Sequence, residues 1–361
     1  MRILFSHRLL LATLTVSALA TGTMQALAVK QTDIPRTKAG KPDFTGVYDT
    51  GTLTPLNRPK AFGNKKFMTP EEAEQVTKTV LGRFDFANQD SSPDRGAPQK
   101  GGDGNNTAGA GGVGGYNAFW IDPGNKTFEI DGKFRTSIIY APQDGRQPPR
   151  TPAALTKMAQ SFASFTHDND GTASWLAHDG PGPFDGPESL APSERCLVSF
   201  SPTVPSLPSL YNNYKRIVQT EDHVMILQEM VHDARIIRMN KSHGPADVRT
   251  WLGDSVGHWE GDTLVVETRN FKATNGLHGA DENLLVTERF TLQTNGQIVY
   301  DFTVNNPTAW TAPWSGEYSW TPSDQKVYEY ACHEGNYAMP GILKGARRLE
   351  KEWVPPDHAG Q

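Results

Sequence analysis

A long succession of short β-strand patterns, joined by tight turns, fills the C-terminal half of the chain and constrains the fold more than any other feature. Asn295-Gly296 is a strong hairpin signal, and Glu260-Gly261-Asp262 is a good turn. Short connections make neighbouring strands antiparallel, and a sheet of about ten strands needs closure or a second layer to hide its edges. The strand patterns cover residues 214–220, 223–230, 234–239, 248–251, 256–260, 263–271, 284–293, 297–304, 316–321 and 326–332.

The N-terminal half adds shorter strand patterns and two helices. Thr69-Pro70 is followed by two glutamates, and this order of cap, first-turn proline and early acids predicts a helix to about Phe84. Thr151-Pro152 repeats the cap and the proline, and predicts a helix to about Phe165. We therefore expect an all-β-dominated fold, an antiparallel meander that forms a lipocalin- or calycin-like barrel with two helical insertions. Four early strands are predicted at residues 44–50, 116–121, 126–130 and 134–140. The first of them, 44–50, should pair with the C-terminal meander or lie beside it.

The N-terminus has the pattern of an export signal. A positive region with Arg2 and Arg8 precedes an apolar run, and Ala26-Leu27-Ala28 fits the small-x-small cleavage rule. The apolar run has about a dozen residues, too few to span a bilayer, although an uncleaved anchor is the alternative. We expect a signal peptide at 1–28, a periplasmic or secreted protein, no transmembrane segment in the mature chain, and a single barrel domain over 29–361.

Composition indicates which classes of partner to expect and whether the cysteines form a disulfide. The formal net charge of −5 provides no concentrated positive field, so we expect no nucleic-acid partner. The only cysteines are Cys196 and Cys332, which we expect to pair in an oxidising compartment; a nucleophilic Cys332 beside His333 is the alternative. Residues 93–115 are rich in Gly, Asn and Ala, and are predicted to form a disordered loop.

Several polar residues are candidates for acid–base catalysis because they interrupt strong β patterns or lie in loops between them. They are His232, His278, Glu288, His333 and Glu334, and we expect His232 and His333 to share a polar cavity near the His278 loop, with Glu282, Glu288 or Glu334 as carboxylate partner. Each residue has a structural alternative. For His232 it is a hydrogen-bonded strand junction, for His278 a solvated turn, for Glu288 a buried ion pair with an arginine, and for His333 and Glu334 a packed barrel end.

Aromatic residues near the C-terminus are candidates for holding a substrate. Trp310, Trp314, Tyr330 and Tyr337 fit an aromatic, terpenoid or sugar ligand, with core packing as the alternative for the tryptophans. No HExxH, CxxC or dinucleotide-binding motif is present, so we expect no cofactor. A zinc site built from His232, His278 and His333 remains an alternative.

Several segments resemble a group of uncharacterised exported bacterial proteins. That group has no established activity, so the resemblance implies an exported location and assigns no catalytic residue. The first of these segments and the late strand meander also loosely resemble lipocalin-type barrels, an analogy of fold that does not give function. The segments that carry the resemblance are GKPDFTGVYDT, GYNAFWIDPG, DGRQPP, ERCL, VHDARIIRM, WLGDSVGHWEGDTLVVETRNF, ENLLVTERFTL and YEYACHEGNYAM.

These features predict a periplasmic, cofactor-independent enzyme. It would be a lyase, isomerase or hydrolase that acts on a small apolar or glycosidic molecule by histidine and carboxylate acid–base chemistry. The alternatives are a lipocalin-type protein that binds a small ligand and an envelope-associated structural protein. Titratable groups clustered in one cavity favour the enzyme, an apolar cavity favours the binding protein, and the lack of a sizeable cavity favours the structural protein.

Overall fold

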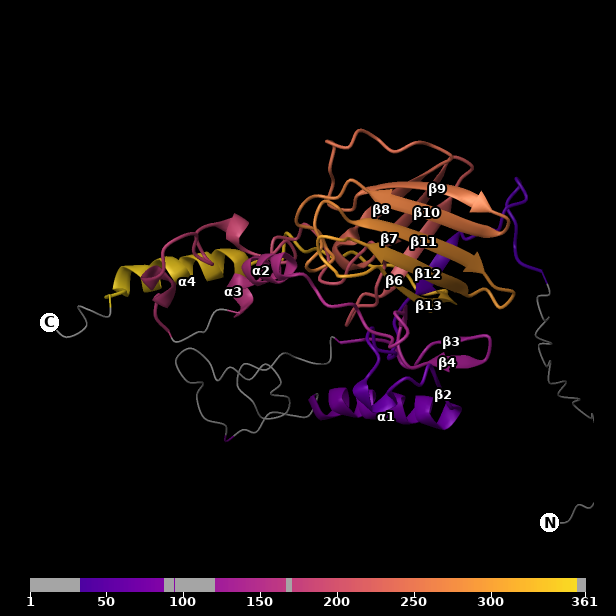
Figure 1. Ribbon diagram of the computed structural model, residues 1–361, viewed down its shortest axis with the longest axis horizontal. Helices are drawn as coiled ribbons and strands as arrows, with labels where there is room; N and C mark the ends of the chain where they lie inside the picture. Colours follow the sequence, from indigo (N-terminus) through magenta and orange to yellow (C-terminus); the bar gives the residue numbers. More distant parts are fainter. Residues whose placement is uncertain (1–32, 88–93, 95–120, 167–170, 356–361) are drawn as a thin grey trace, which may run out of the picture. The chain divides into compact units, whose positions relative to one another are not determined.

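Nine β-strands close into a barrel at the centre of the fold (Figure 1). The order around the ring is β1-β6-β7-β8-β9-β10-β11-β12-β13, and β1 pairs with both β6 and β13. The predicted barrel, with an early strand beside the late meander, is therefore confirmed. The strands are β1 Gly46–Asp49, β6 Tyr214–Gln219, β7 His223–Gln228, β8 Ala234–Met239, β9 Asp254–Glu260, β10 Thr263–Arg269, β11 Leu285–Leu292, β12 Ile298–Asn305 and β13 Trp314–Ser323.

The computed structural model describes residues 33–87, 94, 121–166 and 171–355. The predicted signal peptide, the strand expected at 116–121 apart from its last residue, and the Gly-rich segment 93–115 apart from Asp94 lie outside the described residues. The described residues belong to one compact unit that begins at Asp33. No helix in the described part of the chain is long and apolar enough to cross a membrane.

An odd number of strands explains the one parallel pair in the barrel. Each antiparallel neighbour reverses the strand direction, and a closed ring needs an even number of reversals. All pairings in this ring are antiparallel except that of β8 with β9. The pattern at 248–251 predicted an intervening strand, which was wrong. That segment makes an isolated bridge between Thr250 and Phe271, and the chain returns along the barrel without a full strand.

Alternation along the strands fills the interior of the barrel with large side chains. In β12, Ile298, Tyr300, Phe302 and Val304 are buried, and the residues between them are more exposed. The Tyr300 ring centroid lies 5.0 Å from that of Trp320 and 5.5 Å from that of Tyr318, its partner on β13. The interior is therefore a packed core.

A loop reaches into the barrel from the segment before β6. The backbone N–H of Ser206 donates to the hydroxyl oxygen of Tyr300 (2.8 Å), and the Tyr318 hydroxyl donates to the Ser206 carbonyl (2.9 Å). Val204 and Leu207 join the main hydrophobic core. This loop thus packs against inward-facing tyrosines of two strands.

Helices and short strands flank the barrel. Thr151 caps α2 by accepting a hydrogen bond from the Ala154 N–H (3.2 Å), and Thr69 and Glu72 cap each other at the start of α1, so both predicted helix starts are confirmed. The helices are α1 Pro70–Ala87, α2 Pro152–Ser161, α3 Ala163–Thr166 and α4 Ala338–Glu352, with 3₁₀ turns at Lys60–Phe62, Ser174–Ala177, Pro187–Ser189 and Met230–His232. The remaining strands are β2 Phe67–Met68, β3 Glu129–Ile130, β4 Lys133–Arg135 and β5 Ile139–Ala141.

The segment after β13 differs from the prediction. Residues 326–332 form no strand, and the chain turns into α4 instead. On α4, Ala346 and Leu349 pack with Trp175 and Phe184, which come from far earlier in the chain. Pro340 is tolerated because it lies in the first turn of the helix, where its missing N–H has no partner to lose.

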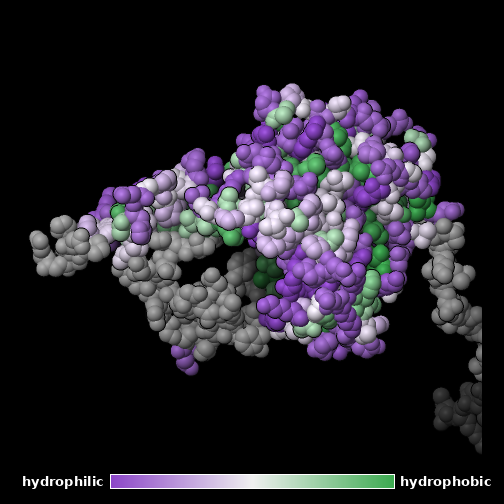
Figure 2. Space-filling view, viewed as in Figure 1, coloured by the Kyte–Doolittle hydropathy of each residue, from purple (hydrophilic) through white to green (hydrophobic). Residues whose placement is uncertain are grey.

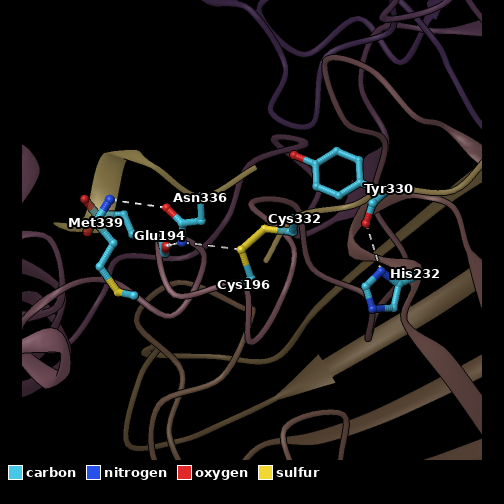
Figure 3. The surroundings of a disulfide bond; sticks show 7 residues. All are labelled: Glu194, Cys196, His232, Tyr330, Cys332, Asn336 and Met339. Atoms are coloured by element: carbon cyan, nitrogen blue, oxygen red, sulfur yellow. Dashed lines mark hydrogen bonds between the residues drawn. A yellow bond between two sulfur atoms is a disulfide. The ribbon is translucent and has the colours of Figure 1, made fainter. Parts of the chain in front are cut away.

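The predicted Cys196–Cys332 disulfide is confirmed (Figure 3). The two Cα atoms are 5.8 Å apart, and 136 residues separate the cysteines in sequence. The bond therefore ties the segment before the Ser206 loop to the segment that leads into α4. Most of the molecular face drawn in Figure 2 carries hydrophilic side chains, with hydrophobic ones in smaller groups between them.

Candidate functional site

The structure places the predicted catalytic residues in separate surroundings. Glu288 lies inside the barrel, and His278 lines a large cleft beside the Ser206 loop. His232 is exposed in the turn between β7 and β8, and its Nδ1 lies 2.9 Å from the carbonyl oxygen of Tyr330 (Figure 3). His333 and Glu334 are exposed in the turn before α4. Of these five residues, only His278 lines either of the two clefts described below, and it lines the first.

Glu288 is enclosed inside the barrel and lines neither of the two clefts described below, which corrects its predicted place in a cavity shared with His278. Its side chain is 0% exposed and forms an ion pair with Arg235, with Nη1 2.9 Å from Oε1 and Nη2 bonded to Oε2. The Tyr300 hydroxyl donates to Oε1 of Glu288 at 2.7 Å. Arg235 also donates to the hydroxyls of Ser255 and Thr268. The buried ion pair, the alternative for Glu288, is therefore the arrangement found, and its hydrogen bonds satisfy both charges.

The two predicted substrate-binding tryptophans belong to the core. Trp310 and Trp314 are each 1% exposed, and their rings meet edge to face with centroids 5.8 Å apart. They are therefore out of reach of a ligand, which corrects the prediction. Tyr330 is half-buried and lines a cleft beside the disulfide, whereas Tyr337 is 81% exposed.

The described residues include no group of three or more His, Cys, Asp or Glu that could hold a metal ion. The ring nitrogens of His232 and His278 each lie within hydrogen-bond distance of a backbone carbonyl, those of Tyr330 and Phe200.

Lys215, which the sequence analysis missed, is buried inside the barrel. Its Nζ donates to Oε1 of Gln228 (3.1 Å) and lies 5.8 Å from the centroid of the Trp320 ring. Burial lowers the pKa of Lys215 to about 7, against the opposing charges of Asp49, Glu229 and Asp233. Burial likewise raises the pKa of Asp233 to about 6. The signal was present in the sequence, because strand alternation places Lys215 on the same face as Ile217.

The largest of the clefts that we describe, named the His278 cleft, has a volume of about 780 Å³. Its wall is mainly apolar, and no lining residue among those described carries a permanent charge. Phe200 and Leu210 on this wall are 44% and 55% exposed, although both are large and apolar. The lining residues are Thr52, Thr54, Leu56, Ile121, Pro123, Ile138, Phe200, Ser201, Pro202, Leu207, Pro208, Ser209, Leu210, Tyr211 and His278.

His278 lines this cleft and has one ring nitrogen that can accept a hydrogen bond. Its Nε2 lies 3.0 Å from the carbonyl oxygen of Phe200, and because a carbonyl only accepts, Nε2 carries the hydrogen. Nδ1 is then the acceptor of the neutral ring. Burial, with the positive charge of Arg150, lowers the pKa of His278 below 6.5, although the Phe200 carbonyl opposes the shift. The ring also packs edge to face against Phe162, with centroids 4.7 Å apart.

Hydrogen bonds hold the wall of the cleft in place and engage several of its other polar groups. The Asn213 amide accepts from the Ser209 N–H (2.8 Å) and donates to the carbonyls of Ser209 (2.9 Å) and Asp122 (3.0 Å). The Ser201 hydroxyl donates to the Pro208 carbonyl at 2.7 Å, and the Thr54 hydroxyl accepts from the Phe128 N–H at 3.2 Å. These bonds hold segments that are distant in sequence around one apolar space.

Comparison with known proteins gives no relative from which to transfer a function. No protein-family model matches the chain, and no curated protein matches it significantly. The molecule is thus defined by its own geometry, a closed β-barrel protein with an apolar cleft beside the barrel.

Proposed function

We propose that the protein binds a small, uncharged, mainly apolar molecule in the His278 cleft. The single observation that carries this proposal is an apolar cleft of about 780 Å³ with one neutral imidazole on its wall. Small-molecule sites commonly have volumes of roughly 300–1,000 Å³ and combine apolar walls with a few polar groups. The His278 cleft matches that description in size and chemistry.

The absence of charged side chains among the described lining residues selects against an ionic ligand. An ion that leaves water for an apolar site loses its hydration, and a wall without charged side chains cannot replace it. His278 instead offers Nδ1 as an acceptor, which suits a hydroxyl or N–H group on an otherwise apolar molecule. We therefore expect a neutral ligand with at least one hydrogen-bond donor.

Exposed apolar surface supplies the driving force for binding. Phe200 and Leu210 keep about half of their surface in contact with water. Covering apolar surface contributes about 2.5 kcal/mol per 100 Å². A ligand that covers both side chains thus gains several kcal/mol before the entropy cost of association.

The geometry supports binding more than the expected acid–base catalysis. Catalysis by His278 with a carboxylate partner requires an Asp or Glu in the same cleft, and none is among the described lining residues. A lipocalin-type ligand inside the barrel is also less well supported, because aromatic side chains and the Ser206 loop fill the interior. The proposed ligand lies beside the barrel.

Export by a cleavable signal peptide to the periplasm or the exterior remains part of this proposal. The Cys196–Cys332 disulfide supports it, because structural disulfides persist mainly in oxidising compartments.

The proposal can be tested with N-phenyl-1-naphthylamine, an uncharged fluorescent probe that carries one N–H donor. We expect saturable binding, and His278→Phe should weaken it about fivefold, the effect of one lost hydrogen bond. Affinity should stay constant above pH 6.5 and fall as the pH drops through the lowered pKa of His278, because a protonated ring cannot accept at Nδ1. Fluorescence titrations across pH measure both effects.

A matched control is His258→Phe, which changes an exposed histidine of β9 outside the cleft. Equal affinity in wild type and His278→Phe, or a pH dependence that persists in that variant, contradicts the proposal.

A further inference from the structure

A second cleft, named the disulfide cleft, lies beside the Cys196–Cys332 bond and has a volume of about 560 Å³. Both cysteines line it, so a covalent bond joins its two walls (Figure 3). One wall comes from the segment around Cys196 and the other from the segment that runs through Cys332 into α4. The two walls are therefore held together by a covalent bond in addition to side-chain packing.

We propose that the disulfide cleft binds an organic cation with an apolar body, such as an aryl or alkyl ammonium compound. This cleft shares Phe200 with the proposed neutral-ligand site, but its other lining residues are different and the proposal does not rest on that site. Three features of the cleft lead to the proposal: the sign of its charged groups, the nature of its walls, and the prior use of its other polar groups.

The charged side chains among the described residues that line the cleft are Glu194 and Glu329, and both are acidic. Neither forms an ion pair within the described part of the chain. Glu194 is half-buried, and its Oε2 accepts from the Ser164 hydroxyl (2.9 Å) and the Ala191 N–H (2.8 Å). Oppositely charged ligands are attracted to such a site, and anions are repelled.

The walls of the cleft suit the apolar body of such a ligand. Phe200, Val231, Met339 and Ile342 supply apolar surface, and the rings of Phe200 and Tyr330 can face a cation. Val231 is turned into this wall by a left-handed backbone, with φ of 59°, a conformation that a β-branched residue rarely adopts. Aromatic rings combined with carboxylates are typical of sites that recognise ammonium groups.

The other polar groups of the cleft are already engaged. Asn336 donates through Nδ2 to the Glu194 carbonyl (2.7 Å) and accepts at Oδ1 from the Met339 N–H (3.3 Å), as Figure 3 shows. The Tyr330 carbonyl accepts from His232 at 2.9 Å. The charges of Glu194 and Glu329 are thus what selects the ligand, and the Glu194 carboxylate is held in place by its bonds to Ser164 and Ala191.

The test compares two probes of nearly identical shape, benzyltrimethylammonium and its uncharged carbon analogue, neopentylbenzene. NMR titration of the full chain should show that the cation binds at least tenfold more tightly. Glu329→Gln, a change at an exposed residue, should weaken the cation about threefold and leave the neutral analogue unchanged, and added salt should reduce the difference between the probes. Glu194→Gln combined with Glu329→Gln should remove the preference for the cation.

Glu221→Gln is the matched control, because it removes one exposed carboxylate in the turn between β6 and β7, away from the cleft. Equal binding of the two probes by wild type overturns the proposal. A loss of cation affinity that is the same in Glu221→Gln and Glu329→Gln also overturns it, because it reports net charge rather than a site. Both outcomes are independent of whether N-phenyl-1-naphthylamine binds the His278 cleft.

Discussion

The inside of the barrel contains buried charged side chains, whereas the His278 cleft beside it exposes large apolar side chains. The barrel encloses Arg235, Glu288 and Lys215, each at most 3% exposed, whereas the cleft leaves Phe200 and Leu210 about half exposed to water. Buried charges are costly and are kept only when they are satisfied, and exposed apolar surface is costly and is kept where something covers it. We therefore interpret the charged groups as structural, and the apolar wall is the site at which we propose that a ligand binds.

Within the barrel, the Arg235–Glu288 pair and Lys215 differ in how well they are satisfied. The pair has a two-point contact and three further hydroxyl partners. Lys215 has Gln228 as its hydrogen-bond partner, and burial lowers its pKa. We expect the loss of one partner of the pair to leave a costly unpaired charge, and the buried Lys215 to make stability depend on pH.

Removal of Glu288 should give the largest effect. Glu288→Ala leaves Arg235 buried without its counter-ion and should lower the free energy of unfolding by about 3–5 kcal/mol. Urea denaturation measures this loss. The folded fraction should bind N-phenyl-1-naphthylamine as wild type does. A loss of binding would show that the His278 cleft depends on the ion pair inside the barrel.

The matching control replaces both partners, Arg235→Met with Glu288→Leu. Because no charge is then left buried, the loss should be well below that of Glu288→Ala. A double variant that is as unstable as the single one would show that the pair itself stabilises the barrel.

Lys215 should make stability rise with pH. Its pKa is about 7 in the folded protein and 10.5 in the unfolded chain, so between these values the unfolded state binds more protons. Stability should therefore increase by about 1.3 kcal/mol per pH unit from pH 8 to 9 and fall as the pH drops through 7. Lys215→Met should lack this increase in urea denaturation at each pH. An equal slope in wild type and variant contradicts the lowered pKa.

The cleft should show the smallest effect on stability and a clear effect on binding. Leu210→Ser changes an exposed side chain and should alter the free energy of unfolding by less than about 0.5 kcal/mol. It should weaken the naphthylamine probe about threefold, because apolar contact with the ligand is lost. Val218→Ser is the control, since Val218 is 40% exposed on β6 and does not line the cleft. Similar binding losses in both variants would mean that the probe binds exposed apolar surface in general.

The barrel was predictable because its signals are local. Alternating strands and tight turns gave the meander, a cap and a proline gave the starts of α1 and α2, and two cysteines left one possible intramolecular pair. The strand expected at 326–332 was wrong: in this segment the Tyr328 N–H donates to the Glu229 side chain and Cys332 is bonded to Cys196. Helix α4 was missed because Pro340 and two glycines obscure a pattern whose apolar residues pack on Trp175 and Phe184.

The site was less predictable because its contacts join residues far apart in sequence. The loop around His278 was predicted to be functional, but Phe200, whose carbonyl oxygen accepts from the His278 ring, is 78 residues away. An ion pair with an arginine was the alternative for Glu288, and its partner Arg235, 53 residues earlier, lies on β8, which is not a neighbour of β11. No local pattern encodes a wall assembled from several such segments.

The short strand β1 has a consequence for how the protein behaves at high concentration. Gly46–Asp49 are four residues, and they alone join β6 to β13. If this strand detached, the backbone groups of β6 and part of β13 would be free to pair with strands of other molecules. Strand β1, the shortest of the ring, thus protects these edges from self-association. It is held by pairing with β6 and β13, whose residues are more than a hundred positions away in sequence.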